Sequence, residues 1–295
     1  MMRVREGYRF FINARNLVHR GDVVVFRPGI RNPFFTTDGA GFRHTVFNNE
    51  VLAVRDVIQQ DRYGLVLGSS HIFGIGTAGD EHSLPSLLGE KFGLPFANVS
   101  LPEGNSRNLF AQLSALLMRA PRPPAALIHF SGGDFTNFCY SCIADPVFGS
   151  PNLKQYAQMV EERGSPPEAK DFFKPLLAFT SLWTQLIVRQ CQARKIPVML
   201  GHDTTFFEKS NPSAADIECG LGTAYGPMQE RWFAAHKSFF REFLAHREAL
   251  ARKLGVPLAG PGPSNDYGFF DEFHYDADGT RSLFEEIAEA LGPLL

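Results

Sequence analysis

Short apolar segments alternate with longer amphipathic segments from residue 65 to the end of the chain. The short segments stop at glycine or polar residues, as buried strands do, whereas the long ones carry apolar residues at helical spacing. Strands that alternate with helices form βαβ units, in which helices cover a parallel sheet on both faces. We therefore predict an α/β fold, a three-layer αβα sandwich around a central parallel sheet. The expected strands span residues 65–67, 96–99, 125–130, 196–200 and 256–259, and the expected helices span residues 83–92, 105–118, 172–195, 226–254 and 282–291.

The first 60 residues lack this alternation. We expect residues 1–60 to form an N-terminal extension packed on the main domain, which spans residues 61–295. Within the extension, residues 22–26 read as a strand and residues 32–43 as an irregular, aromatic segment rich in turn-forming residues. A second irregular stretch, residues 135–168, is predicted to be an insertion over the carboxyl ends of the strands, where loops build sites.

The stretch YGLVLGSSHIFGIG, residues 63–76, carries two serines from the end of a predicted strand into a glycine-rich turn. Such a turn can present a hydroxyl as a nucleophile, although a strand followed by an ordinary loop has the same pattern. A serine needs a base to take its proton, and the base needs an acid to orient it. Asp271 and His274, three residues apart near the C-terminus, can supply both.

Ligands of parallel sheets bind outside the carboxyl ends of the strands. Ser70, Gly133 and His202 follow predicted strands, and Asp271 and His274 lie in a predicted loop. We expect these residues to converge on one crevice.

Three other histidines compete for roles in the site. His71 follows the serines directly and is expected to face the substrate or to be structural. His202, with Asp203 beside it, is a second Asp–His pair at the end of a strand. His44, like its neighbour Arg43, reaches the cleft in one interpretation and belongs to the irregular N-terminal segment in the other.

Three blocks of the sequence resemble, in order, those of the SGNH hydrolases, also called GDSL-type esterases and lipases. Residues 68–76 are similar to the first block, Gly-Asp-Ser followed by a glycine-containing turn, and residues 98–104 to the second, an asparagine followed by a glycine. Residues 271–274 match the last block, Asp-x-x-His. The resemblance covers residues 34–292, and residues 38–43 also resemble a segment of bacterial members that act on cell-surface glycans.

The resemblance implies a flavodoxin-like SGNH hydrolase fold with a Ser-His-Asp triad. In this triad Ser70 is the nucleophile, His274 the base and Asp271 the residue that holds the base. The oxyanion hole would use the backbone N–H groups of Ser70 and Gly104. The family requires no metal and no organic cofactor, so we expect neither.

The sequence departs from the family pattern at three places. Ser69 replaces the aspartate before the nucleophile, and Gly104 lies one residue further from Asn98 than expected, so that Glu103 could donate instead. In the third block, normally Gly-x-Asn-Asp, Gly133 replaces the asparagine whose side chain donates to the oxyanion. Loss of one such donor can cost about a hundred- to a thousandfold in rate. The candidate replacements are Asn137, Asn105 and the backbone N–H of Gly133.

Composition limits the possible partners. The formal net charge is −2 and no long run of one sign occurs, so the chain lacks the concentrated basic surface that nucleic acids need. No apolar stretch has the length of a membrane span, and the first 22 residues do not resemble a secretory signal, so a cytoplasmic location is expected. Cys139 and Cys142 form a lone C-x-x-C, for which unpaired thiols are the leading interpretation and a redox pair or a metal site the alternatives.

The leading functional hypothesis is a serine esterase that hydrolyses an acyl ester, with an O-acetyl group on a carbohydrate as the candidate substrate. Its substrate would be a small-molecule or glycan ester. An O-acyltransferase on the same scaffold and a non-catalytic glycan-binding protein are the alternatives. The sequence indicates neither the oligomeric state nor the acyl group.

Overall fold

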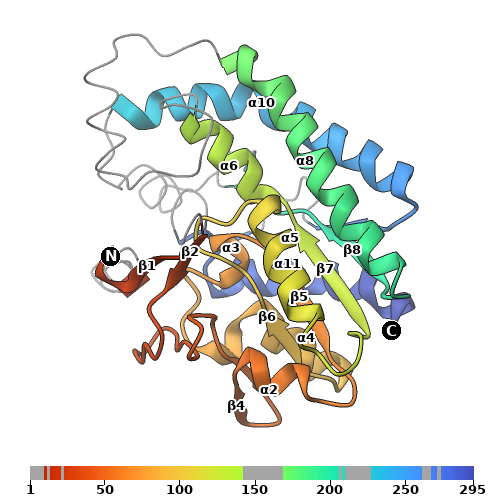
Figure 1. Ribbon diagram of the computed structural model, residues 1–295. Coiled ribbons are helices and arrows are strands. Elements are labelled where there is room, and N and C mark those ends of the chain that lie inside the picture. Colours follow the sequence, from red (N-terminus) through yellow and green to blue (C-terminus); the bar gives the residue numbers. More distant parts are fainter. Residues whose placement is uncertain are drawn as a thin grey trace.

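The structure, a computed structural model, describes residues 10–11, 14–20, 23–141, 169–205, 208–209, 227–260, 267–270 and 274–295. Its centre is a parallel sheet of five strands in the order β6-β5-β7-β8-β9 (Figure 1). The strands are β5 (Gly64–Leu67), β6 (Phe96–Asn98), β7 (Ala126–Phe130), β8 (Val198–Gly201) and β9 (Leu258–Ala259). The predicted fold class and each of the five predicted strands are therefore confirmed.

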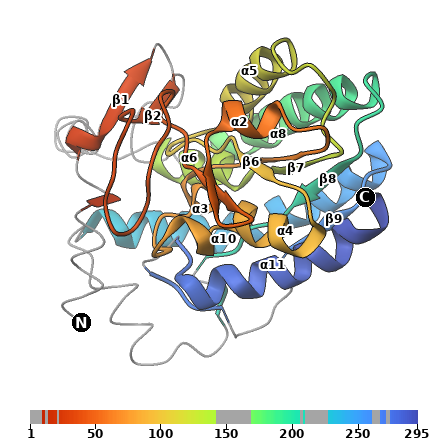
Figure 2. The same cartoon turned by 90° about the horizontal axis from the view of Figure 1, so that it is seen from below.

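Helices cover both faces of the sheet, because successive side chains of a strand point to opposite faces. In β5, Leu65 and Leu67 pack in one apolar core and Val66 packs in the other. In Figure 2, helices α5 and α8 lie on one side of the sheet, and α4 and α11 lie on the other. The helices are α4 (Leu84–Phe92), α5 (Ser106–Leu117), α8 (Ala169–Gln192), α10 (Pro227–Leu254) and α11 (Ala277–Leu291).

The strand order places a topological switch point at β5. β5 pairs in parallel with β6 on one side and with β7 on the other, and Leu65 faces both Ala97 and Leu127. Counted along the sheet in chain order, the strands follow the 2-1-3-4-5 order of flavodoxin-like folds, whose ligands bind between the first and third strands. The loops that follow β5 and β7 are therefore the expected place for a site.

The N-terminal part forms short hairpins laid against the sheet and α4. These elements are η1 (Ala14–Asn16), β1 (Leu17–Arg20), β2 (Val23–Phe26), β3 (Thr45–Phe47), β4 (Glu50–Leu52) and α2 (Val54–Ile58). The Thr45 hydroxyl donates to the Phe96 carbonyl of β6, and the Val46 N–H donates to the Ser86 hydroxyl of α4. β2 confirms the strand predicted at residues 22–26, whereas the boundary between an extension at 1–60 and a domain at 61–295 stays a prediction.

An aromatic cluster joins this N-terminal part to the segment that follows β5. Its buried members are Phe11, Phe26, Phe35, Phe73 and Ile75. The rings of Phe26 and Phe73 lie 4.6 Å apart between centroids, and those of Phe35 and Phe73 lie 5.7 Å apart. These aromatic contacts therefore hold the N-terminal part against the segment that carries Ser70.

Two predictions about elements are wrong in part. Residues 132–141 form helix α6 (Gly132–Ser141), although an irregular insertion was expected from residue 135; the rest of that insertion, residues 142–168, lies outside the described residues. Helix α11 begins five residues before residue 282, because the Asp276 carboxylate accepts the Gly279 N–H and so caps its first turn. The remaining short helices are α3 (Ser70–Phe73), η2 (Asp80–His82) and η4 (Gly292–Leu294).

Within the described residues, no helix combines the length and apolar character that a bilayer span needs.

Candidate active site

Three of the predicted blocks meet at the carboxyl ends of neighbouring strands. Ser70 is the first residue of α3, which follows β5, and Gly133 lies in the first turn of α6, which follows β7. A Cβ built on Gly133 would lie 2.8 Å from the Cβ of Ser69 and would clash with the carbonyl oxygen of Gly104, which follows β6. The loops after β5, β6 and β7 are therefore in contact at the switch point of the sheet.

The structure brings Ser70 and His274 together. The Ser70 Oγ lies 2.9 Å from the His274 Nε2, and both side chains are partly exposed. This distance suits a proton transfer from a hydroxyl to an imidazole. Asp271 lies outside the described residues.

The chain around His274 is held by backbone pairing and by a buried tyrosine. Phe269 and Tyr275 form an antiparallel bridge, and the Phe270 N–H donates to the His274 carbonyl over 2.7 Å. The buried Tyr275 hydroxyl accepts the N–H of Thr204 over 2.7 Å, which ties this segment to the end of β8. These contacts anchor His274 to the sheet.

The backbone N–H groups of Ser70 and Gly133 suit the oxyanion hole. Both residues lie in the first turn of a helix, where N–H groups have no partner within the helix. The N–H of Gly104, by contrast, already donates to the Leu101 carbonyl over 3.1 Å.

The two candidate asparagines have other partners. The Asn137 Nδ2 lies 3.5 Å from the Glu103 carbonyl, so that α6 touches the loop after β6. The Asn105 Oδ1 accepts the Asn108 N–H over 3.0 Å and caps helix α5. Asn137 therefore lies beside the predicted oxyanion loop, whereas Asn105 serves the start of a helix.

His71 takes part in a second, buried polar group beside the Ser70–His274 pair. Its Nδ1 lies 2.9 Å from the Ser69 Oγ and 3.8 Å from an oxygen of Asp203, and its ring centroid lies 5.2 Å from that of His274. His71 and Ser69 are both buried, which supports the structural interpretation of His71. Ser69, which replaces the family's aspartate, is thereby a partner of His71.

Asp203 is a buried carboxylate that lies 3.8 Å from the His71 Nδ1. Burial raises its pKa to about 6, against the lowering effect of the nearby Arg247. Its carboxylate packs directly on Gly132, where any Cβ would clash with it. The predicted pair was His202–Asp203, but the histidine that lies 3.8 Å from this carboxylate is His71, which follows β5.

His202 points to α10 rather than to Ser70. Its Nδ1 lies 3.1 Å from a terminal nitrogen of the buried Arg247, which also donates to the Gly201 carbonyl. Burial and the charge of Arg247 lower the pKa of His202 well below its ordinary value, so the ring is neutral. His202 therefore joins β8 to α10, and its predicted site role gains no support.

Asp134, the last residue of the third block, fixes the start of α6. It accepts the Ser106 N–H over 2.7 Å, the Ser106 hydroxyl over 2.6 Å and the Thr180 hydroxyl over 2.9 Å. One carboxylate thus joins α5, α6 and α8. This role is not apparent from the sequence, because the three helices are separate segments of the chain.

Arg43 and His44 bind groups other than the Ser70–His274 pair. Arg43 is fully buried and binds backbone carbonyls, and the His44 Nδ1 lies 2.8 Å from the Thr36 hydroxyl. The interpretation in which Arg43 reaches the cleft is therefore wrong.

Among the described residues, no group of His, Cys, Asp and Glu side chains has the geometry to hold a metal ion. Cys191 is a buried free thiol, and burial raises its pKa to about 12. The side chains of the Cys139–Cys142 pair lie outside the described residues.

Comparison with solved structures identifies the fold. An extracellular lipase from Streptomyces rimosus is 13% identical over 79% of this chain and 100% of its own, with a TM-score of 0.50. A GDSL-like lipase from Bacteroides thetaiotaomicron is 14% identical over 79% of this chain and 89% of its own, with a TM-score of 0.48. A carbohydrate acetylesterase family member from Sinorhizobium meliloti is 12% identical over 79% and 99%, with a TM-score of 0.46.

No protein-family model and no curated protein matches the chain. The solved structures confirm the resemblance to SGNH hydrolases at the level of the fold, and at such low identities they show the fold alone.

Proposed function

We propose that this protein is a serine ester hydrolase with Ser70 as its nucleophile. The observation that carries the proposal is the 2.9 Å distance between the Ser70 Oγ and the His274 Nε2, at the switch point of a parallel sheet. A serine and a histidine at hydrogen-bond distance, both partly exposed in a ligand-binding place, have the arrangement of an activated nucleophile.

In the first step the Ser70 Oγ attacks the ester carbonyl while the His274 Nε2 takes the hydroxyl proton. His274 then gives that proton to the departing alcohol oxygen, which leaves an acyl group on Ser70. Water attacks the acyl group with His274 as base again, and the acid and free serine result. Asp271 would hold His274 in the required tautomer; this role rests on the Asp-x-x-His spacing alone.

The negative charge on the carbonyl oxygen needs donors in place before the reaction. We propose the backbone N–H groups of Ser70 and Gly133, which belong to the first turns of α3 and α6. From the loop after β6 we propose Glu103 or Gly104, with Asn137 beside them.

For the substrate we propose an O-acetyl ester on a carbohydrate. This proposal rests on the resemblance of residues 38–43 to a segment of bacterial proteins that act on glycans, and not on a contact in the site. Transfer of the acyl group to a sugar hydroxyl would use the same acyl-enzyme, so product analysis must distinguish acetate release from transfer.

Hydrolysis of short-chain aryl esters tests the proposal directly. We expect purified wild type to release the aryl alcohol and Ser70→Ala to lose at least about a hundredfold in rate, because the attacking oxygen is gone. Ser114→Ala is the matched control, since its hydroxyl bonds the Phe110 carbonyl of α5 and the Gln190 side chain of α8 rather than His274, and it should keep the wild-type rate. Equal rates for wild type and Ser70→Ala would remove Ser70 from the mechanism.

A further inference from the structure

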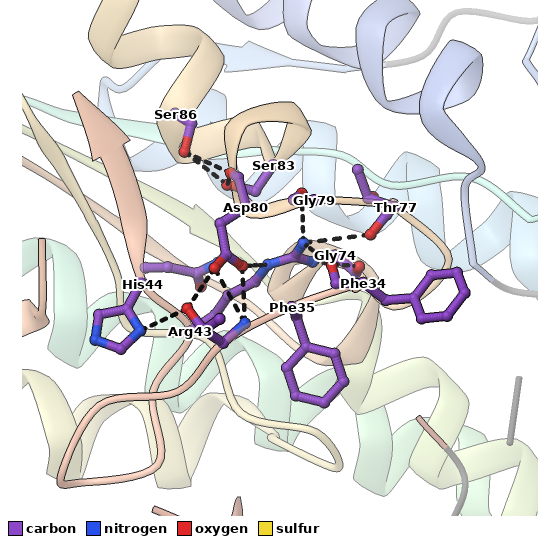
Figure 3. Close-up of polar contacts among 12 residues, drawn as sticks. Phe34, Phe35, Arg43, His44, Gly74, Thr77, Gly79, Asp80, Ser83 and Ser86 are labelled. Carbon is purple, nitrogen blue, oxygen red and sulfur yellow. Dashed lines mark hydrogen bonds and ion pairs between the residues drawn. The ribbon is translucent and has the colours of Figure 1, made fainter. Parts of the chain in front are cut away.

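Arg43 is a fully buried cation that does not reach the substrate side of the site. Its Nε donates to the Asp80 carboxylate over 2.8 Å. Its two terminal nitrogens bind backbone carbonyls on several segments at once (Figure 3). These carbonyls belong to Phe34, Phe73, Gly74, Thr77 and Gly79.

Two of these carbonyls belong to the end of the helix that carries Ser70. Helix α3 contains only four residues, Ser70–Phe73, and so short a helix has little stability of its own. Arg43 donates to the Gly74 carbonyl over 2.5 Å and to the Phe73 carbonyl over 3.3 Å. A cation that binds the last carbonyls of a helix satisfies their hydrogen bonds and complements the helix dipole.

The lack of a side chain at Gly74 makes room for this contact. Gly74 ends α3 with a φ of +89°, and a Cβ at this position would lie 2.5 Å from an Arg43 nitrogen. The absence of a side chain therefore lets the guanidinium come directly onto the helix end.

Asp80 fixes the other side of the guanidinium. It accepts the N–H of Thr36 over 3.0 Å and the Thr36 hydroxyl over 2.5 Å, in addition to Arg43. Burial lowers the pKa of Arg43, and the charge of Asp80 opposes that effect. A buried ion pair is retained at such a desolvation cost only where further hydrogen bonds complete it, as they do here.

We propose that Arg43 is a positioning residue that holds α3, and with it the Ser70 hydroxyl, in the orientation that His274 requires. The proposal rests on the ester hydrolase function proposed above. It also gives the N-terminal part of the chain a role in catalysis, since Arg43 lies between the two hairpins and contacts α3 from there.

Arg43→Lys tests this role, because one ammonium group cannot replace two terminal nitrogens that span five carbonyls. At a temperature where the variant is fully folded, we expect a kcat about 10- to 100-fold below wild type, with KM within about twofold. Modification of Ser70 by a fluorophosphonate should slow by the same factor, because it depends on the same geometry without substrate binding.

Thr45→Val is the matched control for stability. Thr45 is buried two residues from Arg43, and its hydroxyl binds the Phe96 carbonyl of β6 rather than α3. We expect this variant to have a lower Tm and unchanged values of kcat and of the Ser70 modification rate.

Gly74→Ala changes the same contact at the end of α3. It is the second test variant, for use if Arg43→Lys does not fold. We expect it to lower kcat as well, because the added methyl group displaces the guanidinium. If folded Arg43→Lys or folded Gly74→Ala kept a kcat within twofold of wild type, the proposal would be overturned. It would also be overturned if Thr45→Val lost as much kcat as Arg43→Lys. If wild type itself neither hydrolyses esters nor reacts with the fluorophosphonate, the proposed function fails instead.

Discussion

Gly133 stands where the resembled family has an asparagine that donates to the oxyanion, and the structure gives a steric reason for the glycine. Any Cβ at this position meets the Gly104 carbonyl and lies 2.8 Å from the Ser69 Cβ. The backbones of the two loops thus approach more closely than an asparagine permits.

Gly133→Asn, the change that restores the family residue, is therefore expected to reduce activity rather than to raise it. The added side chain forces the loop after β6 away from α6, which costs about 1–3 kcal/mol of the free energy of unfolding. Chemical denaturation and ester hydrolysis measure the two effects. A gain in kcat for Gly133→Asn would show that the lost asparagine, and not the backbone, limits the site.

Helix α6 shows at the level of elements how contacts distant in sequence decide local structure. Gly132 and Gly133 predict a turn, and the segment was expected to be an irregular insertion. The Asp134 carboxylate instead binds the start of α5 and the middle of α8, and so fixes the first turn of a helix. Propensity is a weak guide where such tertiary contacts intervene.

Asp134→Ala should destabilise the protein by about 3 kcal/mol, because it leaves buried donors on Ser106 and Thr180 without an acceptor. Thr180→Val, which removes one of these bonds together with its donor, should cost about 1 kcal/mol. Urea denaturation compares the two variants. Equal costs would contradict the view that Asp134 joins three helices.

The sequence predicted the sheet well because its strands are buried on both faces and read as continuous apolar runs. It also predicted that Ser70 and His274 meet, from short motifs at the ends of strands. It did not predict the short elements β1, β3, β4 and α2, which have only three to five residues each. Nor did it predict the contact of His71 with Asp203, because the two residues are 132 positions apart and the local pattern pairs Asp203 with its neighbour His202.

On the scale of the whole molecule, Asp203 should make stability depend on pH. Its pKa rises from 3.8 to about 6 on folding, so the folded state binds a proton more tightly than the unfolded state. This contribution to stability is complete below pH 3.8 and is lost as pH rises through 6. Since a tenfold change in proton affinity corresponds to about 1.4 kcal/mol, the loss amounts to about 3 kcal/mol.

Asp203→Asn removes this titration while it keeps the shape of the side chain. Relative to wild type, the variant should gain about 3 kcal/mol of unfolding free energy between pH 4 and pH 7. Urea titrations at several pH values measure the difference. A difference that does not change with pH would show that the Asp203 carboxyl titrates at the same pH in the folded and unfolded states.

Covalent labelling of the folded chain tests the central claim that Ser70 is a nucleophile activated by His274. We predict that a fluorophosphonate forms a single adduct on Ser70, located by peptide mass spectrometry, and that His274→Ala forms it at least about a hundredfold more slowly. A folded wild-type chain without an adduct on Ser70, or equal labelling rates for wild type and His274→Ala, would contradict the account.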